Sequence, residues 1–526
     1  MRSLRVLLGI ALVQQAALGQ TISPPQAVGH LAGPGAASNP SGLRLYGTDS
    51  GWTFEHRGKL VILFGDTWPD ANLPCEPPPT NDDAQGTLPL FAPRGTPRVT
   101  FETKASSPLD FDPIQLFRGA TSLPMGFGKI PATGFSDGRS AIAAIGTSDL
   151  VRCQGGSAST PGQCPGASLS CGPNVGECLP TVANIPLLCD ATAGTGCLQG
   201  QTCTQTTGFC VDPTSSQNDG TTSSAPYTVA QNIDLGVQRP GSVIYDSAFT
   251  WPTNKFWNVN SRTVRNFTFT RHGNDYRPGD NYLLMWGRPG FSGEQGRQAQ
   301  LYLMAQRLPI PTDSAGHFRF RPSFFAGTRA QGHEPKWSFL ESEAKPLALD
   351  GIVDGSPHED RVLVNQTAMS YLPPPVDKWI MLYGGDVPDV LLVDPVNSRN
   401  VPSPGAIMVR FADNPWGPWT PPAPYLSPGN PAVPGDPYGP GGFLFHYACV
   451  DQGSATCART DPHRPLDVLN PECSPPPFPF DIGRLYGANV IDAYTRPDGH
   501  GGLDFYWNVS TWNPYGVMLM KSNIRP

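Results

Sequence analysis

Residues 43–70 read LRLYGTDSGWTFEHRGKLVILFGDTWPD, which is two β-type runs joined by a glycine-containing turn. The pattern predicts a β-hairpin, and each run brings an aspartate next to a glycine, Asp49 in GTD and Asp66 in GDTW. A carboxylate in an apolar strand is costly unless it is hydrogen-bonded or used in chemistry. Two such acids, with Trp52 and Trp68 beside them, make this hairpin a candidate catalytic corner.

The composition of the 526-residue chain favours short strands over helices. It contains 60 prolines and 58 glycines, and only 15% of its residues are charged. Prolines and glycines at this frequency are typical of many strands joined by turns. The net charge of −7 offers no basic field for phosphates, so we do not expect a nucleic-acid partner.

The N-terminus has the layout of a signal peptide. Arg2 and Arg5 precede an apolar run, and small residues follow up to Gly19, so residues 1–19 are predicted to be removed on export. No segment approaches the roughly 20 apolar residues of a membrane-spanning helix. We therefore expect a secreted, periplasmic or cell-surface protein without a membrane span.

Paired strands recur along the chain. An apolar strand, a turn and a second strand are expected within residues 43–68, 134–149, 281–308, 378–413 and 503–523. Each pair alone would expose an apolar face, and radial stacking of the pairs would bury it. The sequence thus predicts an all-β protein that forms a five-bladed β-propeller. A two-sheet sandwich is the alternative fold.

The expected domain order follows from shifts in composition. Residues 20–42 read as an extended lead, residues 43–152 as the first part of the propeller, and residues 226–526 as the remaining blades. Residues 153–212 read as a small disulfide-rich insertion, and residues 213–225 as a linker.

Disulfides are expected in the insertion because it is rich in cysteine but poor in large apolar residues, and because the chain is expected to be exported. The cysteine spacings lack the paired C-x₂-C steps of most zinc sites. The predicted disulfide cysteines are Cys153, Cys164, Cys171, Cys178, Cys189, Cys197, Cys203 and Cys210.

Three segments resemble familiar catalytic motifs, but none is expected to have the usual function of its motif. Residues 134–138, GFSDG, match the nucleophile elbow of serine hydrolases, but the Asp-Gly step between β-type runs favours a hairpin turn. A serine esterase that uses Ser136 remains a minor alternative. His333-Glu334 and His358-Glu359 lack the second histidine of a zincin helix, so no metal is expected. No cofactor motif is complete either.

Residues in the loops and strand starts of a propeller converge on one end of its central channel. The substrate-binding candidates outside the first hairpin are polar or aromatic residues at such positions. They are Trp286, Arg288, Gln366, Asp386, His446, Trp512 and Tyr515.

Four motifs resemble a secreted bacterial family once known only as a domain of unknown function. They are GTDSGWTFEHRGKLVILFGDTW at residues 47–68, KWIMLYGGD at 378–386, ADNPWGPW at 412–419 and STWNPYGVMLMKS at 510–522. The resemblance implies a five-bladed propeller, because that family adopts one. Some of its members are endo-D-arabinofuranosidases that cut the D-arabinan of mycobacterial cell walls. The Gly-Pro-Trp turn is also similar to that of arabinanase and xylosidase propellers.

The resemblance implies that Asp49 and Asp66 lie on the channel rim. Glycosidases pair an acid with a base or nucleophile, so Asp49 is expected to be the base or nucleophile and Asp66 the acid partner or the neighbour that tunes its pKa. Many relatives have a Gly-Glu-x-Ser step where this chain has Gln366, which cannot act as an acid or base. The expected function is cleavage of an arabinofuranose-containing or related polysaccharide, and the alternative is a noncatalytic carbohydrate-binding or adhesion propeller.

Overall fold

The computed structural model describes residues 20–33, 36, 43–45, 47–68, 82–92, 94–119, 121–123, 125, 129–147, 169–171, 178–180, 202–203, 210–211, 232–253, 255–265, 281–288, 301–312, 314, 318–329, 334–349, 367–385, 391–393, 400–402, 406–426, 485–511 and 516–526. It is nearly all-β, and five sheets of four to six strands are arranged as the blades of a β-propeller. The predicted fold class is confirmed, and the two-sheet sandwich is excluded. No helix in the described part of the chain is long and apolar enough to cross a membrane.

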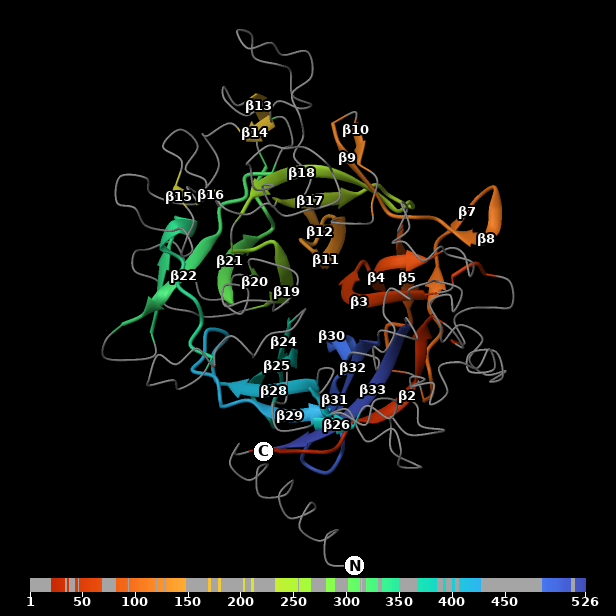
Figure 1. Ribbon diagram of the computed structural model, residues 1–526, viewed down its shortest axis with the longest axis vertical. Helices are drawn as coiled ribbons and strands as arrows, with labels where there is room; N and C mark the ends of the chain where they lie inside the picture. Colours follow the sequence, from red (N-terminus) through yellow and green to blue (C-terminus); the bar gives the residue numbers. More distant parts are fainter. Residues whose placement is uncertain are drawn as a thin grey trace, which may run out of the picture. The chain divides into compact units, whose positions relative to one another are not determined.

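The chain divides into two compact units, Met1–Pro113 with Ala348–Pro526, and Ile114–Leu347. The first unit holds three of the sheets (Figure 1). One runs β3 (Gly47–His56), β4 (Lys59–Trp68), β5 (Asp82–Leu88) and β6 (Thr100–Phe101). The next runs β24 (Thr367–Leu372), β25 (Lys378–Gly385), β28 (Ala406–Ala412) and β29 (Ala423–Leu426). The C-terminal sheet contains β30 (Leu485–Val490), β32 (Leu503–Thr511) and β33 (Gly516–Arg525), with β31 (Arg496–Pro497) at its edge.

The β3–β4 hairpin is the one predicted from residues 43–70. Its turn residues Arg57 and Gly58 both have positive φ, 48° and 75°, as the twist of a two-residue hairpin requires. The apolar side chains Leu60, Ile62 and Phe64 alternate along β4 and are at most 2% exposed, so this face of the hairpin packs into a core. The hairpin is therefore held both by its turn and by burial.

The N-terminal lead does not stay outside the fold. The strands β1 (Thr21–Ile22) and β2 (Gln26–Ala32) both pair antiparallel with β33. Thr21 lies opposite Arg525, and Gln26 lies opposite Lys521. The fold thus begins before Leu43, where the sequence placed its start. Two register shifts in β2 break its alternation, which explains why no strand pattern was visible.

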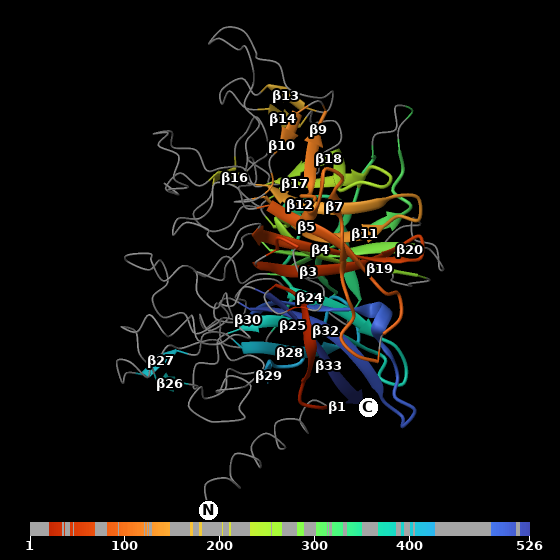
Figure 2. The same cartoon turned by 90° about the vertical axis from the view of Figure 1, so that its right-hand side faces the viewer.

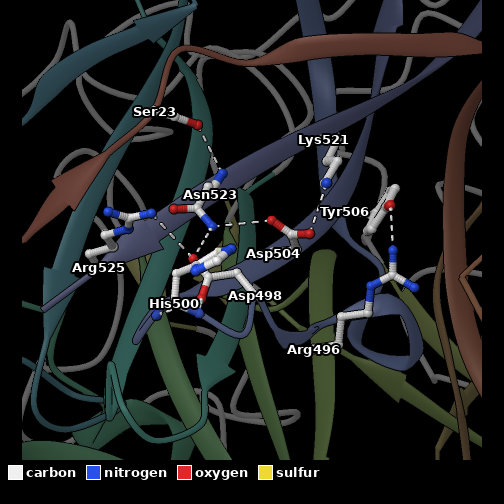
Figure 3. A network of polar contacts seen from close by, with 10 residues as sticks. Ser23, Arg496, Asp498, His500, Asp504, Tyr506, Lys521, Asn523 and Arg525 are labelled. Carbon is white, nitrogen blue, oxygen red and sulfur yellow. Dashed lines mark hydrogen bonds and ion pairs between the residues drawn. The ribbon is translucent and has the colours of Figure 1, made fainter.

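Polar contacts hold this junction of the chain ends (Figure 3). The backbone N–H of Asn523 donates to Ser23 Oγ over 2.9 Å, and its side-chain amide donates to Asp498 Oδ2 over 2.9 Å. Asp498 Oδ1 also accepts the backbone N–H groups of His500 and Gly502. These bonds lower the pKa of Asp498 to about 2, with the Asn523 bond contributing most.

The second unit holds the other two of the five large sheets. One has the order β10 (Thr121–Leu123), β9 (Gln115–Arg118), β18 (Ile244–Pro252), β17 (Asn232–Gln238), β12 (Ala141–Thr147) and β11 (Lys129–Ser136). The other runs β19 (Asn258–Val264), β20 (Asn281–Arg288), β21 (Tyr302–Leu308), β22 (Ser323–Thr328) and β23 (Pro335–Ser338). The 3-10 helix η2 (Glu341–Glu343) follows β23.

Residues 134–136 end β11, and the predicted hairpin turn follows directly, with Ser136 paired to Ala141 of β12. Asp137 Oδ1 accepts the backbone N–H groups of Arg139 and Ser140 over 2.8 and 2.7 Å, and the chain then enters β12. A nucleophile elbow needs a helix at this point. The serine esterase alternative built on Ser136 therefore has no structural support.

The predicted cysteine-rich insertion lies between β12 and β17, which are adjacent strands of one sheet. Four short strands of it are described: β13 (Leu169–Cys171), β14 (Cys178–Pro180), β15 (Thr202–Cys203) and β16 (Cys210–Val211). Their registers place Cys171 opposite Cys178 and Cys203 opposite Cys210. Cys153, Cys164, Cys189 and Cys197 lie outside the described residues, as does the predicted signal peptide. The disulfides stay a prediction.

Two further short hairpins complete the strands. They are β7 (Thr103–Lys104) with β8 (Ser107–Phe111), and β26 (Leu391–Val393) with β27 (Asn400–Pro402).

Candidate functional site

The two aspartates of the first hairpin both lie at irregularities in its sheet. The register of β3 against β4 shifts on each side of Asp49 and Ser50, and β4 shifts against β5 at Gly65 and Asp66. Ser50 and Asp66 have φ values of 68° and 37°, which non-glycine residues seldom adopt. Bulges and left-handed residues recur next to active sites, where they redirect side chains. The irregular backbone at this end of the hairpin therefore marks it as a candidate functional site.

Asp49 is held as a hydrogen-bond acceptor. Ser50 Oγ donates to Asp49 Oδ1 over 3.0 Å, and the Tyr486 hydroxyl donates to Asp49 Oδ2 over 3.0 Å. Asp49 is 4% exposed and Tyr486 is 5% exposed. Hydrogen bonds donated to a carboxylate favour its charged form, so the arrangement suits a base or a nucleophile.

The C-terminal sheet fixes the bulge that carries Asp49. Ser510 Oγ in β32 accepts the Ser50 N–H over 2.8 Å. The Gly51 carbonyl accepts the side-chain amides of Asn508 over 2.6 Å and of Asn489 over 3.2 Å. Gly51 has a φ of 81°, and a Cβ there would lie 2.6 Å from Asn508 Nδ2. β30, β32 and β33 lie side by side in this sheet (Figure 1, Figure 2), so the bulge rests on a rigid support.

Hydroxyl groups tie β3 to β4 on the other side of the bulge. Thr48 Oγ donates to the Gly65 carbonyl over 3.0 Å and lies 2.8 Å from Thr67 Oγ. Both threonines are fully buried. The backbone on each side of Asp66 is thus anchored, while the Asp66 side chain remains partly exposed. Of the two predicted catalytic acids, Asp66 is the more open to solvent.

A third acid, Asp83 in β5, was missed by the sequence reasoning. It lies opposite the Gly65–Asp66 bulge, and its Oδ1 accepts the Asp66 N–H over 2.9 Å. Asp83 is fully buried. None of the predicted strand pairs includes this segment, because DDAQGTL lacks the β-branched and aromatic residues typical of strands. The sequence signal that could have identified Asp83 is the pair of adjacent acids, Asp82 and Asp83, at the start of the short segment DDAQGTL.

Burial raises the pKa of Asp83 well above its usual range. The negative charges of Asp66, Asp49 and Asp82 act in the same direction, and only the hydrogen bond from the Asp66 N–H opposes them. A carboxyl group in this environment is favoured in its neutral form. The site therefore combines a carboxyl group that accepts two hydrogen bonds, a partly exposed acid and a buried acid whose pKa is raised by burial.

Three of the predicted substrate-binding residues, two tryptophans and one arginine, have buried side chains. Trp52, Trp286 and Arg288 are each 1% exposed. Burial lowers the pKa of Arg288 to about 9. A side chain enclosed in this way has no face available to a sugar ring, so these residues belong to the interior of their own units.

The remaining predicted residues are not placed by the structure. Trp68 ends β4, and only its backbone is described. The predicted residues that lie outside the described part of the chain are Gln366, Asp386, His446, Trp512 and Tyr515. Among the side chains that are described, no group of three or more His, Cys, Asp or Glu residues is arranged to hold a metal ion.

Comparisons with known proteins leave the function open. No family model and no curated protein matches the sequence. Among solved structures, the chain is similar to a crystal structure described as a "putative hydrolase" from Bacteroides ovatus ATCC 8483, with 8% identity over 92% of this chain and 88% of that one. The TM-score of this match is 0.39, which is too low to carry an argument.

Proposed function

We propose that the protein is an exported glycoside hydrolase of the propeller type. The observation that supports this most is the placement of Asp49 and Asp66 at facing bulges of one hairpin, with the buried Asp83 behind them. Hydrolysis of a glycosidic bond needs two carboxyl groups in different protonation states, and their environments must differ to keep them so. Asp49 and Asp66 have different exposure and different partners, which is the asymmetry required.

The proposed reaction adds water across the bond between an anomeric carbon and the leaving oxygen. An acid donates a proton to the leaving oxygen as that bond breaks, and a carboxylate assists the attack on the anomeric carbon either directly or through water. Two donated hydrogen bonds support Asp49 as the carboxylate. Its partial exposure supports Asp66 as the acid partner, or as the neighbour that tunes the pKa of that acid.

The proposed substrate is an arabinofuranose-containing or related polysaccharide. This narrower statement rests on the resemblance of the first hairpin and the C-terminal strands to the secreted family that includes D-arabinanases. The test is release of reducing ends from arabinan, including mycobacterial arabinogalactan, by the wild type and by Asp49→Asn and Asp66→Asn. We expect both variants to lose at least about a hundredfold in kcat, as is typical for removal of a catalytic acid or base.

Asp246→Asn is the matched control for these variants. Asp246 accepts two hydrogen bonds of 2.8 Å from the exposed side chain of Arg239, so its substitution removes an aspartate charge from a surface ion pair. Full activity of a folded Asp49→Asn variant would remove Asp49 from the mechanism. Saturable glycan binding without turnover by the wild type would favour the alternative, a noncatalytic carbohydrate-binding propeller.

A further inference from the structure

One carboxyl oxygen of Asp83 accepts a hydrogen bond from a neighbouring strand. Its Oδ1 accepts the Asp66 N–H over 2.9 Å. Among the residues that the structure describes, its Oδ2 has no hydrogen-bond partner, although Asp83 is fully buried. Buried carboxylates normally fill both oxygens with donors, because an unsolvated charge is costly. One hydrogen bond is too little to hold an ionised carboxylate in such a place.

Within the described part of the chain, the charged groups that act on Asp83 are all acidic. They are Asp66 on β4, Asp49 on β3 and the neighbouring Asp82 on β5. A charge on Asp83 would therefore be a further negative charge in a cluster that has no opposing cation among these groups. The position favours a protonated side chain that accepts one hydrogen bond and carries no charge.

The bond to Asp66 has a geometric effect as well. Asp66 occupies a left-handed conformation, with a φ of 37°, at the point where two residues of β4 face one residue of β5. This backbone conformation is strained for a residue that has a Cβ, and it persists only when the surrounding structure fixes it. Asp83 supplies the side-chain bond to the backbone N–H of this residue.

We propose that Asp83 is a positioning residue of the acid site, a neutral carboxyl group that fixes the backbone of Asp66 and adds no negative charge beside Asp49 and Asp66. Asp83 itself is too deeply buried to touch a substrate. The effect on turnover rests on the proposed glycosidase function, whereas the protonation state of Asp83 does not.

The first test compares Asp83→Asn and Asp83→Ala in the full chain, with Asp82→Asn as the control one residue away. Asparagine is neutral and keeps an oxygen for the Asp66 N–H, so Asp83→Asn should retain kcat within about threefold. Alanine removes the acceptor, and misplacement of a reacting group by about 1 Å can cost about a hundredfold. We therefore expect Asp83→Ala to lose about ten- to a hundredfold in kcat with KM little changed.

The pH profile separates a neutral Asp83 from a charged one. Removal of a nearby negative charge lowers the pKa of the remaining acids. If Asp83 is neutral, Asp83→Asn removes no charge, and the acidic limb of the kcat profile stays where it is in the wild type. A shift of that limb to lower pH by about one unit, or a loss of kcat in Asp83→Asn as large as in Asp83→Ala, would overturn the proposal.

The second test needs no substrate and uses the variant that keeps the hydrogen bond. A protonated carboxyl group gives a C=O stretching band in the infrared spectrum that a carboxylate lacks. The wild type at pH 7 should show this band, and the difference spectrum against Asp83→Asn should assign it to Asp83. Absence of the band refutes a neutral Asp83 whatever the enzyme does. A band without any glycan hydrolysis supports the protonation state of Asp83 and refutes the proposed function instead.

Discussion

The hydrogen bond from Tyr486 to Asp49 allows a quantitative test of the site. Tyr486→Phe removes one hydroxyl group and keeps the ring, so it isolates the 3.0 Å bond to Asp49 Oδ2. Both residues are buried, at 5% and 4% exposure. A hydrogen bond to a charged group contributes about 1.5–3 kcal/mol, against about 0.5–1.5 kcal/mol for a neutral pair. We expect the free energy of unfolding of Tyr486→Phe to fall by about 1.5–3 kcal/mol.

The assay is urea unfolding at pH 7 followed by tryptophan fluorescence, with Tyr494→Phe as the matched control. The Tyr494 hydroxyl donates to the neutral carbonyl of Pro89 over 2.7 Å, so the same substitution there should cost only about 0.5–1.5 kcal/mol. The excess cost at Tyr486 measures the charge on Asp49. A cost at Tyr486 no larger than at Tyr494 would refute a charged, hydrogen-bonded Asp49.

The same pair of variants links stability to turnover. About 1.4 kcal/mol corresponds to a tenfold change in rate. If Asp49 acts in the reaction, loss of its Tyr486 bond should lower kcat by about ten- to a hundredfold, and Tyr494→Phe should leave kcat unchanged. Equal kcat values for the two variants would show that the bond serves stability alone.

Three further predictions concern stability. Asp498 has a pKa of about 2 in the folded protein, below its ordinary value of 3.8. Its carboxylate therefore stabilises the fold above about pH 4, and this stabilisation is lost as the pH falls toward 2. The melting temperatures of the wild type and of Asp498→Asn should converge over this range. Gly51→Ala should cost about 1–2 kcal/mol in urea unfolding from its positive φ alone, and more because its Cβ would press on Asn508. Lys255→Met should cost about 3–5 kcal/mol, since the buried ammonium donates to three backbone carbonyls and interacts with the buried Glu341 carboxyl. A loss below about 1 kcal/mol would contradict this.

The local parts of the fold could be predicted from the sequence. The hairpin of residues 47–68 and the strand pairs within 281–308, 378–412 and 503–525 were visible because each consists of two apolar runs that lie close together in the sequence. Short-range patterns of this kind depend on neighbouring residues alone.

Features that depend on distant partners could not be predicted. The pairing of β2 with β33 joins the two ends of the sequence, and nothing in QAVGHLA points to its partner. Asp83 became visible only when β5 was placed beside the Asp66 bulge. The burial of Trp52 was hidden because a tryptophan next to an acid has the same sequence pattern whether it lines a core or a binding surface.

The pairing of β1 and β2 with β33 has a consequence for biosynthesis. The hydrogen bond from Asn523 to Ser23 spans 500 residues of sequence, so the ribosome finishes the partner strand only long after the first strand is made. Contacts of such large sequence separation form late and slowly in folding. Until then β2 is an unpaired edge that can join another chain. Premature termination before Gly516 should therefore yield aggregating products, because the strand that seals the last sheet would be missing.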